Sequence, residues 1–370
     1  MLRLLSLLSL ISVIYGQESL TEPAGIINGF PLKIRSMVAH DNTILTGSEL
    51  ELRSVITQYD LNSGSVIKSL SGHTSQVNTL FATDKFIFSG SGDLTIRQWD
   101  LASGSLVKTF TGHTKEVLSV FVKGDKVYST GSDNTVREWD LASGKLLRTL
   151  EGHSDKVTYV HVTDKFIYSS GFDNMVKEWD LATGTVTRNF TGHTQGIWSF
   201  DIEGDRLFTA SDDTFVKQYD LTSGKEVRTY KGHQSHVFAV KVRGDDLFSA
   251  GYDYTARQWS VKDGSLVASI TSHASYVYGL VIQDGVLYTG STDGSIKKWN
   301  VKLSPYSGPR EFSSSGSFSS KSVSTGTSTG ADGGSSSNGG GSGSKQKNGT
   351  SGLITLSFLV ASLAFLILAL

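Results

Sequence analysis

Residues 112–140, GHTKEVLSVFVKGDKVYSTGSDNTVREWD, form the unit from which most of the chain is built. The unit begins with Gly-His, ends with Trp-Asp, and holds two short apolar runs between them. Copies follow one another at a spacing of forty residues without a shift. The recurring positions are a histidine, an aspartate and an aromatic residue: His73, His113, His153, His193, His233 and His273; Asp93, Asp133, Asp173, Asp213, Asp253 and Asp293; Trp99, Trp139, Trp179, Tyr219, Trp259 and Trp299. A fixed period of this length predicts a repeat architecture with one supersecondary unit per copy.

Each copy contains four short segments separated by turns, which is the pattern of a four-stranded blade. In the third unit the expected strands are residues 117–122, 127–130, 135–139 and 146–150. The turn before the fourth strand holds a recurring glycine, Gly144 in this copy, because a loop of this length needs a residue at positive φ. With its Gly-His and Trp-Asp dipeptides, the pattern resembles the WD-repeat family over about residues 22–303. The resemblance implies an all-β fold, a seven-bladed β-propeller of four-stranded antiparallel blades.

The two ends of the repeat region complement each other. An atypical unit precedes the six Gly-His copies, with Gly29-Phe30 where Gly-His is expected. After Trp299 the turn glycine is missing, so the last blade lacks its own fourth strand. We expect residues 22–28 to supply that strand and so to close the ring with the N-terminal strand, as in propellers of this family, which hides sheet edges.

The sequence is expected to divide into four regions. They are a signal peptide at 1–16, a propeller at 17–303 with units at about 30–69, 70–109, 110–149, 150–189, 190–229, 230–269 and 270–303, a disordered Ser/Gly-rich stalk at 304–352, and a hydrophobic tail at 353–370.

Composition excludes several classes of function. Basic and acidic residues nearly balance, with 34 of one and 35 of the other spread through the repeats, so no basic patch favours nucleic acid. The chain has no cysteine, which excludes disulfides, thiolate nucleophiles and cysteine-based zinc sites. We expect neither a metal nor a cofactor, and we expect a monomer.

Both termini have the pattern of a protein that enters the secretory pathway. Arg3, the apolar residues 4–14 and the small Gly16 follow the order of a signal peptide. The uncharged residues 353–370 would reach about 27 Å as a helix and follow a polar spacer and a run of small residues. This order is typical of a glycosylphosphatidylinositol (GPI) attachment signal, with Asn338, Gly341 and Ser342 as candidate attachment residues. A tail anchor or a single membrane span is the alternative.

Two sequons fit the secretory route. They begin at Asn189, in an expected outermost strand, and at Asn348, in the stalk. We therefore expect a glycoprotein that is anchored at the cell surface.

The recurring polar residues resemble a catalytic triad, but their repetition indicates a structural role. In the WD-repeat family these positions form a hydrogen-bonded chain from the Trp indole through Ser or Thr and His to Asp. Two copies here are His113, Ser129, Asp133 and Trp139, and His153, Ser169, Asp173 and Trp179. A set that recurs in six units holds blades together, so we expect no enzyme.

Differences between the repeats are the better guide to function. In family propellers three positions face the top surface: the loop after the histidine, the second residue of the first strand, and the residue before the turn aspartate. Early units have small or polar residues there, such as Asn78 and Ser132. Later units have Phe172, Trp198, Asp212, His236, Phe238, Tyr252, Tyr276 and Tyr278, with Tyr254 just beyond the turn. Rigid aromatic residues are typical anchors of binding sites, so the top face of blades four to seven is the expected partner-binding surface. The alternative for rings such as Trp198 and Phe238 is that they fill space between blades, whereas the tyrosines are expected to be exposed.

A second irregularity lies lower in the first strand. His161, Asp201 and Lys241 occupy the same offset in consecutive units, where Phe81 and Phe121 stand earlier. An ion pair between Asp201 and Lys241 is one reading, and a small-ligand or metal site is the other, although one histidine with one carboxylate is too few ligands for zinc.

Three functions compete. The termini favour a non-enzymatic interaction scaffold at the cell surface that binds a protein or a glycan. The family resemblance favours an intracellular scaffold or adaptor in signalling or ubiquitin-ligase assembly. An enzyme with its site in the channel is the third, and it has no convergent acid–base pair.

Overall fold

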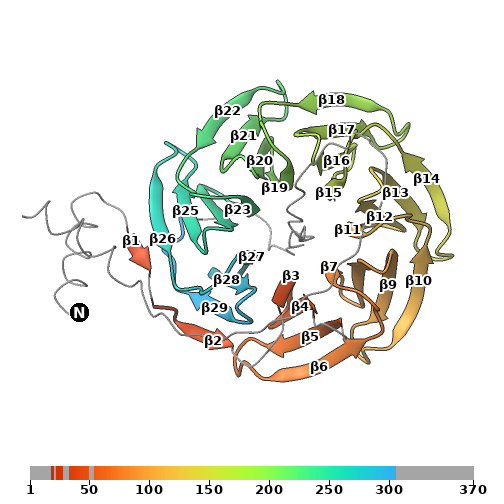
Figure 1. Ribbon diagram of the computed structural model, residues 1–370, viewed down its shortest axis with the longest axis horizontal. Helices are drawn as coiled ribbons and strands as arrows, with labels where there is room; N and C mark the ends of the chain where they lie inside the picture. The colour runs from red at the N-terminus through yellow and green to blue at the C-terminus, as the bar shows by residue number, and fades with distance from the viewer. Residues whose placement is uncertain (1–17, 21, 28–32, 50–53, 306–370) are drawn as a thin grey trace, which may run out of the picture. The chain divides into compact units, whose positions relative to one another are not determined.

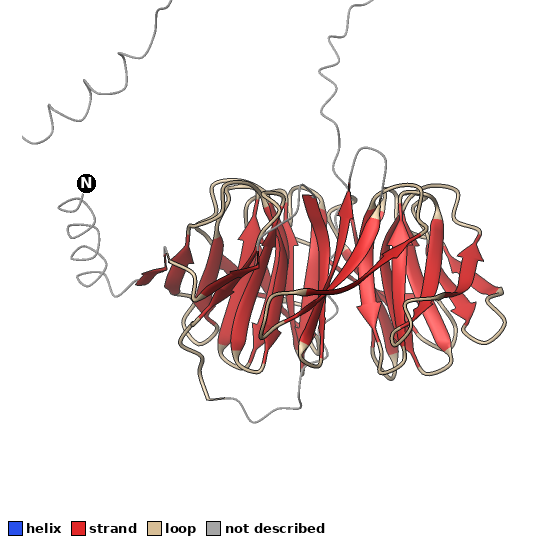
Figure 2. Ribbon diagram, turned by 90° about the horizontal axis from the view of Figure 1, so that it is seen from below, coloured by secondary structure: helices blue, strands red, loops and turns tan. Residues whose placement is uncertain are grey.

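The computed structural model describes residues 18–20, 22–27, 33–49 and 54–305. Every regular element in these ranges is a β-strand, and the strands form seven sheets arranged in a ring (Figure 1). Figure 2 shows the strands running between two faces, with turns at both. The prediction of a seven-bladed propeller with antiparallel four-stranded blades is therefore confirmed.

Blades one to six are built in the same way, with the first strand nearest the axis and the fourth outermost. Blade one has β3 (Lys33–His40), β4 (Thr43–Glu49), β5 (Val55–Asp60) and β6 (Val66–Ser71); blade two has β7 (Val77–Ala82), β8 (Phe86–Ser91), β9 (Thr95–Asp100) and β10 (Leu106–Thr111); blade three has β11 (Val117–Lys123), β12 (Lys126–Gly131), β13 (Val136–Asp140) and β14 (Leu146–Leu150). Blade four has β15 (Val157–Val162), β16 (Phe166–Gly171), β17 (Val176–Asp180) and β18 (Val186–Phe190); blade five has β19 (Ile197–Glu203), β20 (Arg206–Ser211), β21 (Val216–Asp220) and β22 (Glu226–Tyr230); blade six has β23 (Val237–Arg243), β24 (Asp246–Gly251), β25 (Ala256–Ser260) and β26 (Leu266–Ile270).

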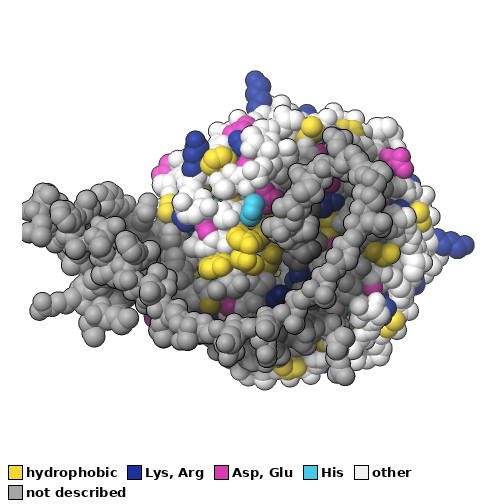
Figure 3. Space-filling view, viewed as in Figure 1, with side chains coloured by type: hydrophobic (Ala, Val, Ile, Leu, Met, Phe, Trp, Pro, Cys, Tyr) yellow, Lys and Arg dark blue, Asp and Glu magenta, His cyan; other side chains and the backbone are white. Residues whose placement is uncertain are grey.

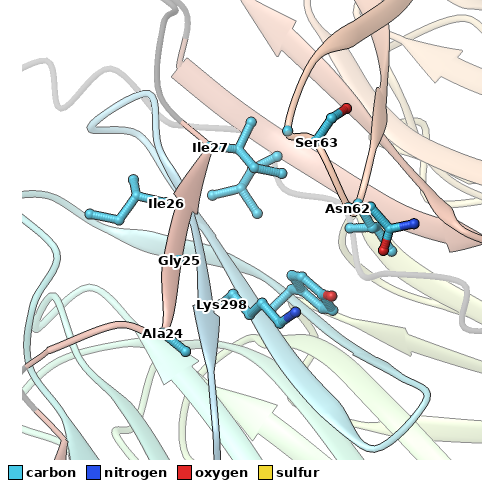
Figure 4. A pocket seen from close by; sticks show the side chains of 11 residues that line it. Ala24, Gly25, Ile26, Ile27, Asn62, Ser63 and Lys298 are labelled. Atoms are coloured by element: carbon cyan, nitrogen blue, oxygen red, sulfur yellow. The ribbon is translucent and has the colours of Figure 1, made fainter.

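Blade seven takes its outer strand from the other end of the chain. Its strands are β27 (Val277–Gln283), β28 (Val286–Ser291), β29 (Ile296–Trp299) and β2 (Gly25–Ile27). The short β2 pairs antiparallel with β29, and Ile27 lies opposite Ile296. Closure by the N-terminal strand is confirmed, and it leaves a pocket of about 200 Å³ beside the turn that holds Ser63. Ile27 points toward this turn, whereas Ile26 points outward (Figure 4).

The hydrophobic core lies between neighbouring blades. One cluster joins Phe88 and Phe110 of blade two to Val120 and Trp139 of blade three, and all four side chains are buried. Similar clusters fill the other junctions, so each blade is stable only between its neighbours.

Two local features explain the regularity of the blades. In blade three Gly144 has a φ of +74°, and its amide donates to the Asp140 carbonyl at 2.8 Å, so glycine relieves a strain that any other residue would meet. The second feature is a β-bulge in the first strand of every blade, where the pairing shifts past the second residue, Leu118 in blade three.

A buried hydrogen-bonded chain ties each of blades two to seven together. In blade three the Trp139 indole donates to Ser129 Oγ at 2.8 Å, Ser129 Oγ lies 2.7 Å from His113 Nε2, and His113 Nδ1 lies 2.8 Å from Asp133 Oδ2. Burial lowers the pKa of His113, so the ring is neutral and its Nδ1–H donates to the carboxylate. Burial alone would raise the pKa of Asp133, but the hydrogen bonds from His113 and Thr135 outweigh it and hold that pKa well below its usual value.

Blade five departs from the pattern only in its aromatic member. Tyr219 is buried where the other blades have tryptophan, and a hydrogen bond joins its hydroxyl to Thr209. The chain of hydrogen bonds is therefore complete in this blade as well. Within the described residues, no helix is long and apolar enough to cross a bilayer.

Candidate functional site: an aromatic surface on blades four to seven

Hydrophobic side chains gather on one face of the ring, over the blades of β23 and β27, with a histidine beside them (Figure 3). They follow a simple rule of position. The residue before the turn aspartate of one blade contacts the loop after the histidine of the next blade. Phe172, Asp212 and Tyr252 occupy the first position, and Gly196, His236 and Tyr276 occupy the second.

Two exposed tyrosines and a half-buried one lie together on this surface, and we call Tyr252, Tyr254 and Tyr276 the tyrosine cluster. The rings of Tyr252 and Tyr276 stack with centroids 3.8 Å apart at 20°, and the Tyr276 hydroxyl donates to the Tyr252 hydroxyl at 2.6 Å. That hydrogen bond raises the pKa of Tyr276 to about 12, so its phenol is neutral. Tyr252 is 38% exposed and Tyr254 is 44% exposed. The cluster therefore presents flat apolar rings whose hydroxyls can still bond to a partner.

Tyr254 occupies a strained backbone conformation. Its φ is +66°, in the left-handed region, at a turn position that other blades fill with Leu94, Asn134, Asn174, Thr214 and Gly294. Asparagine and glycine adopt this conformation readily, whereas a bulky residue there is uncommon. Strain that persists at an exposed aromatic side chain is a reason to suspect function.

A polar group lies beside the tyrosine cluster. His236 Nδ1 is 2.9 Å from Asp212 Oδ1, and the His236 ring meets the Tyr252 ring edge to face at 5.5 Å. The Trp198 indole also donates to Asp212. Burial raises the pKa of Asp212 even though Trp198 and His236 favour its charged form. The carboxylate thus fixes the orientation of both rings.

At the far end of the surface a lysine covers the aromatic rings. Lys156 Nζ lies 3.6 Å from the centroid of Phe172 and 5.0 Å from that of Trp198, which are cation–π distances. Gly196 makes room for the half-buried Phe172 ring, because a Cβ there would lie 2.7 Å from it. The sequence analysis missed Lys156, although it stands at the same offset from the repeat histidine as His236 and Tyr276.

Three of the expected surface residues are buried and lie beneath this surface. Trp198, Phe238 and Tyr278 are 7%, 4% and 4% exposed, so the expectation that the tyrosines are exposed is wrong for Tyr278. They are the second residues of their first strands, where the β-bulge turns each side chain toward the next blade. Trp198 meets Phe238 edge to face at 5.4 Å, and Phe238 stacks on Tyr278 at 4.4 Å. Sequence period alone does not show a bulge, which is why the second residue of the first strand was assigned to the surface.

The same position is buried in the early blades, polar in blades two and four and apolar in blade three, where Leu118 stands. Asn78 Nδ2 donates to the Val117 carbonyl at 3.0 Å, and Thr158 Oγ1 donates to the Ile197 carbonyl at 2.6 Å. Blades two and four thus use hydrogen bonds to the next blade where blades five to seven pack aromatic rings. The stacked rings support the tyrosine cluster, because Phe238 also contacts Tyr252 at 6.0 Å.

Of the three residues at the shared offset lower in the first strand, His161, Asp201 and Lys241, the last two form an ion pair. Lys241 Nζ lies 3.1 Å from Asp201 Oδ1, and Asp201 Oδ2 also accepts from the Val242 amide at 2.9 Å. The His161 ring meets the Phe121 ring at 4.8 Å and a tilt of 55°, and burial lowers the pKa of His161 to about 4. Among the residues that the structure describes, no group of three or more side chains is placed to hold a metal ion.

The modification sites are placed only in part. Asn189 is exposed on the outer strand β18, and its Oδ1 accepts a hydrogen bond from Lys177 at 3.1 Å. Asn348 and the candidate attachment residues Asn338, Gly341 and Ser342 lie outside the described residues, as do residues 1–16 and 353–370.

Comparison with known proteins agrees with this architecture. The family model described as "WD domain, G-beta repeat" matches residues 64–100, 104–140, 144–180, 184–220, 224–260 and 264–300. The fold is similar to a solved structure described as "Crystal structure of WD40 beta propeller domain of Doa1", with a TM-score of 0.67 and 22% identity, covering 76% of this chain and 97% of that one. No curated protein matches the chain. The family matches begin at residue 64, so most of the atypical first blade lies outside them.

Proposed function

The chain belongs to the WD40 repeat family, and from that premise we propose that it is a non-enzymatic scaffold that binds a protein partner through the tyrosine cluster. The observation that carries the proposal is the exposure of Tyr252 and Tyr254 on blade six, which contact the half-buried Tyr276 of blade seven. Tyrosine supplies a large rigid contact area at little cost in side-chain entropy, and it is enriched among the residues that dominate binding energy.

The surroundings of the cluster favour a binding role over a packing role. Rings that only fill space are buried, as Phe238 and Tyr278 are, whereas Tyr252 and Tyr254 remain more than a third exposed. The buried rings below hold the cluster in place before a partner arrives, which reduces the entropy that binding must overcome. At the other end, Lys156 already covers Phe172, so we place the centre of the interface at the tyrosines.

The repeated His–Ser–Asp sets do not act as catalysts in this proposal. Ser129 is fully buried, and its oxygen already accepts from the Trp139 indole. A nucleophile needs an accessible oxygen and an oxyanion site beside it, and neither is compatible with this position.

We place the scaffold at the cell surface. Residues 1–16 and 353–370 support this placement, and the exposed Asn189 on β18 could hold a glycan on the outer rim without covering the tyrosine cluster. An intracellular scaffold is the competing placement. Intact cells that express the chain with a tag near residue 310 should release it when treated with a phospholipase that cleaves GPI. Retention together with cytosolic staining would support the intracellular placement instead.

The binding face is tested separately by proximity labelling of a partner. Wild-type protein is compared with a variant in which Tyr252, Tyr254 and Tyr276 are all serine. A control variant places serine at Leu106, Leu147 and Val227, exposed apolar residues of the outer rim. We expect the tyrosine variant to lose specific labelled proteins that the rim variant keeps. Equal labelling by all three proteins would contradict the proposed face, and loss after enzymatic deglycosylation would identify a glycan as the ligand.

A further inference from the structure

The outer edge of blade six holds a strand that the repeat pattern does not predict. Strand β1 (Glu18–Leu20) runs parallel to β26 and makes this blade a five-stranded sheet (Figure 1). The paired residues are Glu18 with Ala268, Ser19 with Ser269 and Leu20 with Ile270. Leu20 packs against the core of blades six and seven.

Blade six differs from blades one to five in the charge of its outer strand. The third residue of each other outer strand is a lysine or arginine whose head group donates to backbone carbonyls of the next blade: Lys68, Lys108, Arg148, Arg188 and Arg228. Blade six has the buried Ala268 at this position, and β26 has no charged residue. Charged side chains, lysine above all, protect sheet edges from pairing with other strands. The extra strand therefore lies on an outer edge that lacks the cation found in blades one to five.

The docked strand is short enough to leave. Three paired residues are involved, and each backbone hydrogen bond is worth only about 1 kcal/mol net. The connection to β2, residues 21–24, can reach about 13 Å when extended. β1 pairs only with the last three residues of β26, so the outer edge of the start of this strand, at the half-buried Leu266 and Val267, is not covered by β1.

The seam beside this edge is apolar. Ile26 of β2 is 48% exposed and points outward next to the junction of blades six and seven (Figure 4). A second rim placed against this one would bury Ile26 and the start of β26. Exchange of an identical strand between copies forms a dimer at low cost, because every contact is one that the single chain already makes.

We propose that β1 exchanges between two copies of this chain, and that the uncharged outer edge of blade six is the docking site for the second copy's β1. The prediction of a monomer then applies to chains in which β1 pairs with β26 of the same chain. The dimer leaves the tyrosine cluster unused, so this proposal stands independently of the proposed function.

The absence of cysteine from the sequence allows a direct test. Full-length chains with Ser19→Cys and chains with Ser269→Cys are tagged differently, co-expressed and oxidised with glutathione disulfide. These two residues face each other in the pairing register, and opposed positions of adjacent strands suit a disulfide. The matched control replaces Ser269→Cys by Ser69→Cys, which is the same position on the outer strand β6 of blade one.

We expect a disulfide-linked dimer from the Ser19 and Ser269 variants at least five times as abundant as that from the Ser19 and Ser69 variants. Adding Ala268→Lys, which restores the cation found in the other blades, should reduce the dimer to the control level. In a chain with both Ser19→Cys and Ser269→Cys, a disulfide within the chain measures the pairing of β1 with β26 of the same copy. Cross-linking only within that chain, or a dimer no more abundant than the control, would overturn the exchange.

Discussion

Replacing Tyr254 by asparagine should stabilise the propeller, because Tyr254 has a left-handed backbone conformation that asparagine adopts more readily. The φ of Tyr254 is +66°, and those of Asn134 and Asn174 at the equivalent turns are +67° and +68°. The left-handed conformation costs most residues about 1–2 kcal/mol, and the cost is smaller for asparagine because its short side chain can form hydrogen bonds with the nearby backbone. In blade three the Asn134 side-chain amide also donates to the Ser154 carbonyl of the next blade at 3.4 Å.

The expected gain is smaller than the strain, because the tyrosine ring also makes a contact. Tyr254 meets Tyr276 at 5.5 Å and 46°, and aromatic pairs contribute about 0.5–1.5 kcal/mol when well packed. Tyr254 is 44% exposed, so its share lies at the low end. The net result is a stabilisation of about 0.5–1 kcal/mol, or roughly 1–3 °C in Tm for a domain of this size.

The assay is thermal unfolding with a matched control. Leu94 has a φ of +70° at the same turn of blade two and is 39% exposed, outside the tyrosine cluster. Leu94→Asn should raise Tm by a similar or larger amount and leave partner labelling unchanged, whereas Tyr254→Asn should raise Tm and weaken labelling. If Leu94→Asn raises Tm and Tyr254→Asn lowers it, Tyr254 is a packing residue and the reasoning fails. If neither raises Tm, the turns are not strained.

Two further predictions concern the frame and the channel. Ser129→Ala should lower the free energy of unfolding, measured in urea, by about 2–4 kcal/mol, because it leaves the buried Trp139 indole and His113 Nε2 without their hydrogen-bond partner. The control Ser143→Ala, in an exposed turn, should lower it by less than about 1 kcal/mol. Equal losses in the two variants would contradict the structural role of the buried hydrogen bonds. His161→Phe should make stability less sensitive to acid. The folded pKa of about 4 lies below the unfolded value near 6.5, so the unfolded chain binds the proton first and stability falls by about 1–3 kcal/mol between pH 6.5 and 4 in the wild type. Tm measured from pH 7 to 4.5 should fall less in the variant, and parallel curves would refute the assignment.

The fold could be predicted because its determinants are local and repeated. A glycine such as Gly144 at a turn, or a histidine and an aspartate at fixed offsets, reports the same requirement in every unit. Closure by β2 could be predicted too, since the missing turn glycine after Trp299 and the spare segment before Gly29 pointed to each other.

What could not be predicted depends on features without a period. The bulge at the second residue of the first strand turned Tyr278 inward, and no residue type marks it. β1 has three residues, too few for an alternating pattern, and its acceptor differs from other outer strands by one substitution, Ala268. Lys156 was missed because a charged residue in a loop looks like ordinary surface until a ring is found beneath it.

The central claim, that a protein partner binds the tyrosine cluster, is tested most directly by titration of a labelled partner. The partner's Kd is measured for wild-type protein, for the triple serine variant of Tyr252, Tyr254 and Tyr276, and for the rim variant of Leu106, Leu147 and Val227. Residues that dominate an interface cost about 2 kcal/mol or more when truncated, and each 1.4 kcal/mol is a factor of ten. We predict that the tyrosine variant binds at least about 30-fold more weakly, while its Tm stays within a few degrees of wild type and the rim variant binds normally. An unchanged Kd in the folded tyrosine variant would contradict the claim.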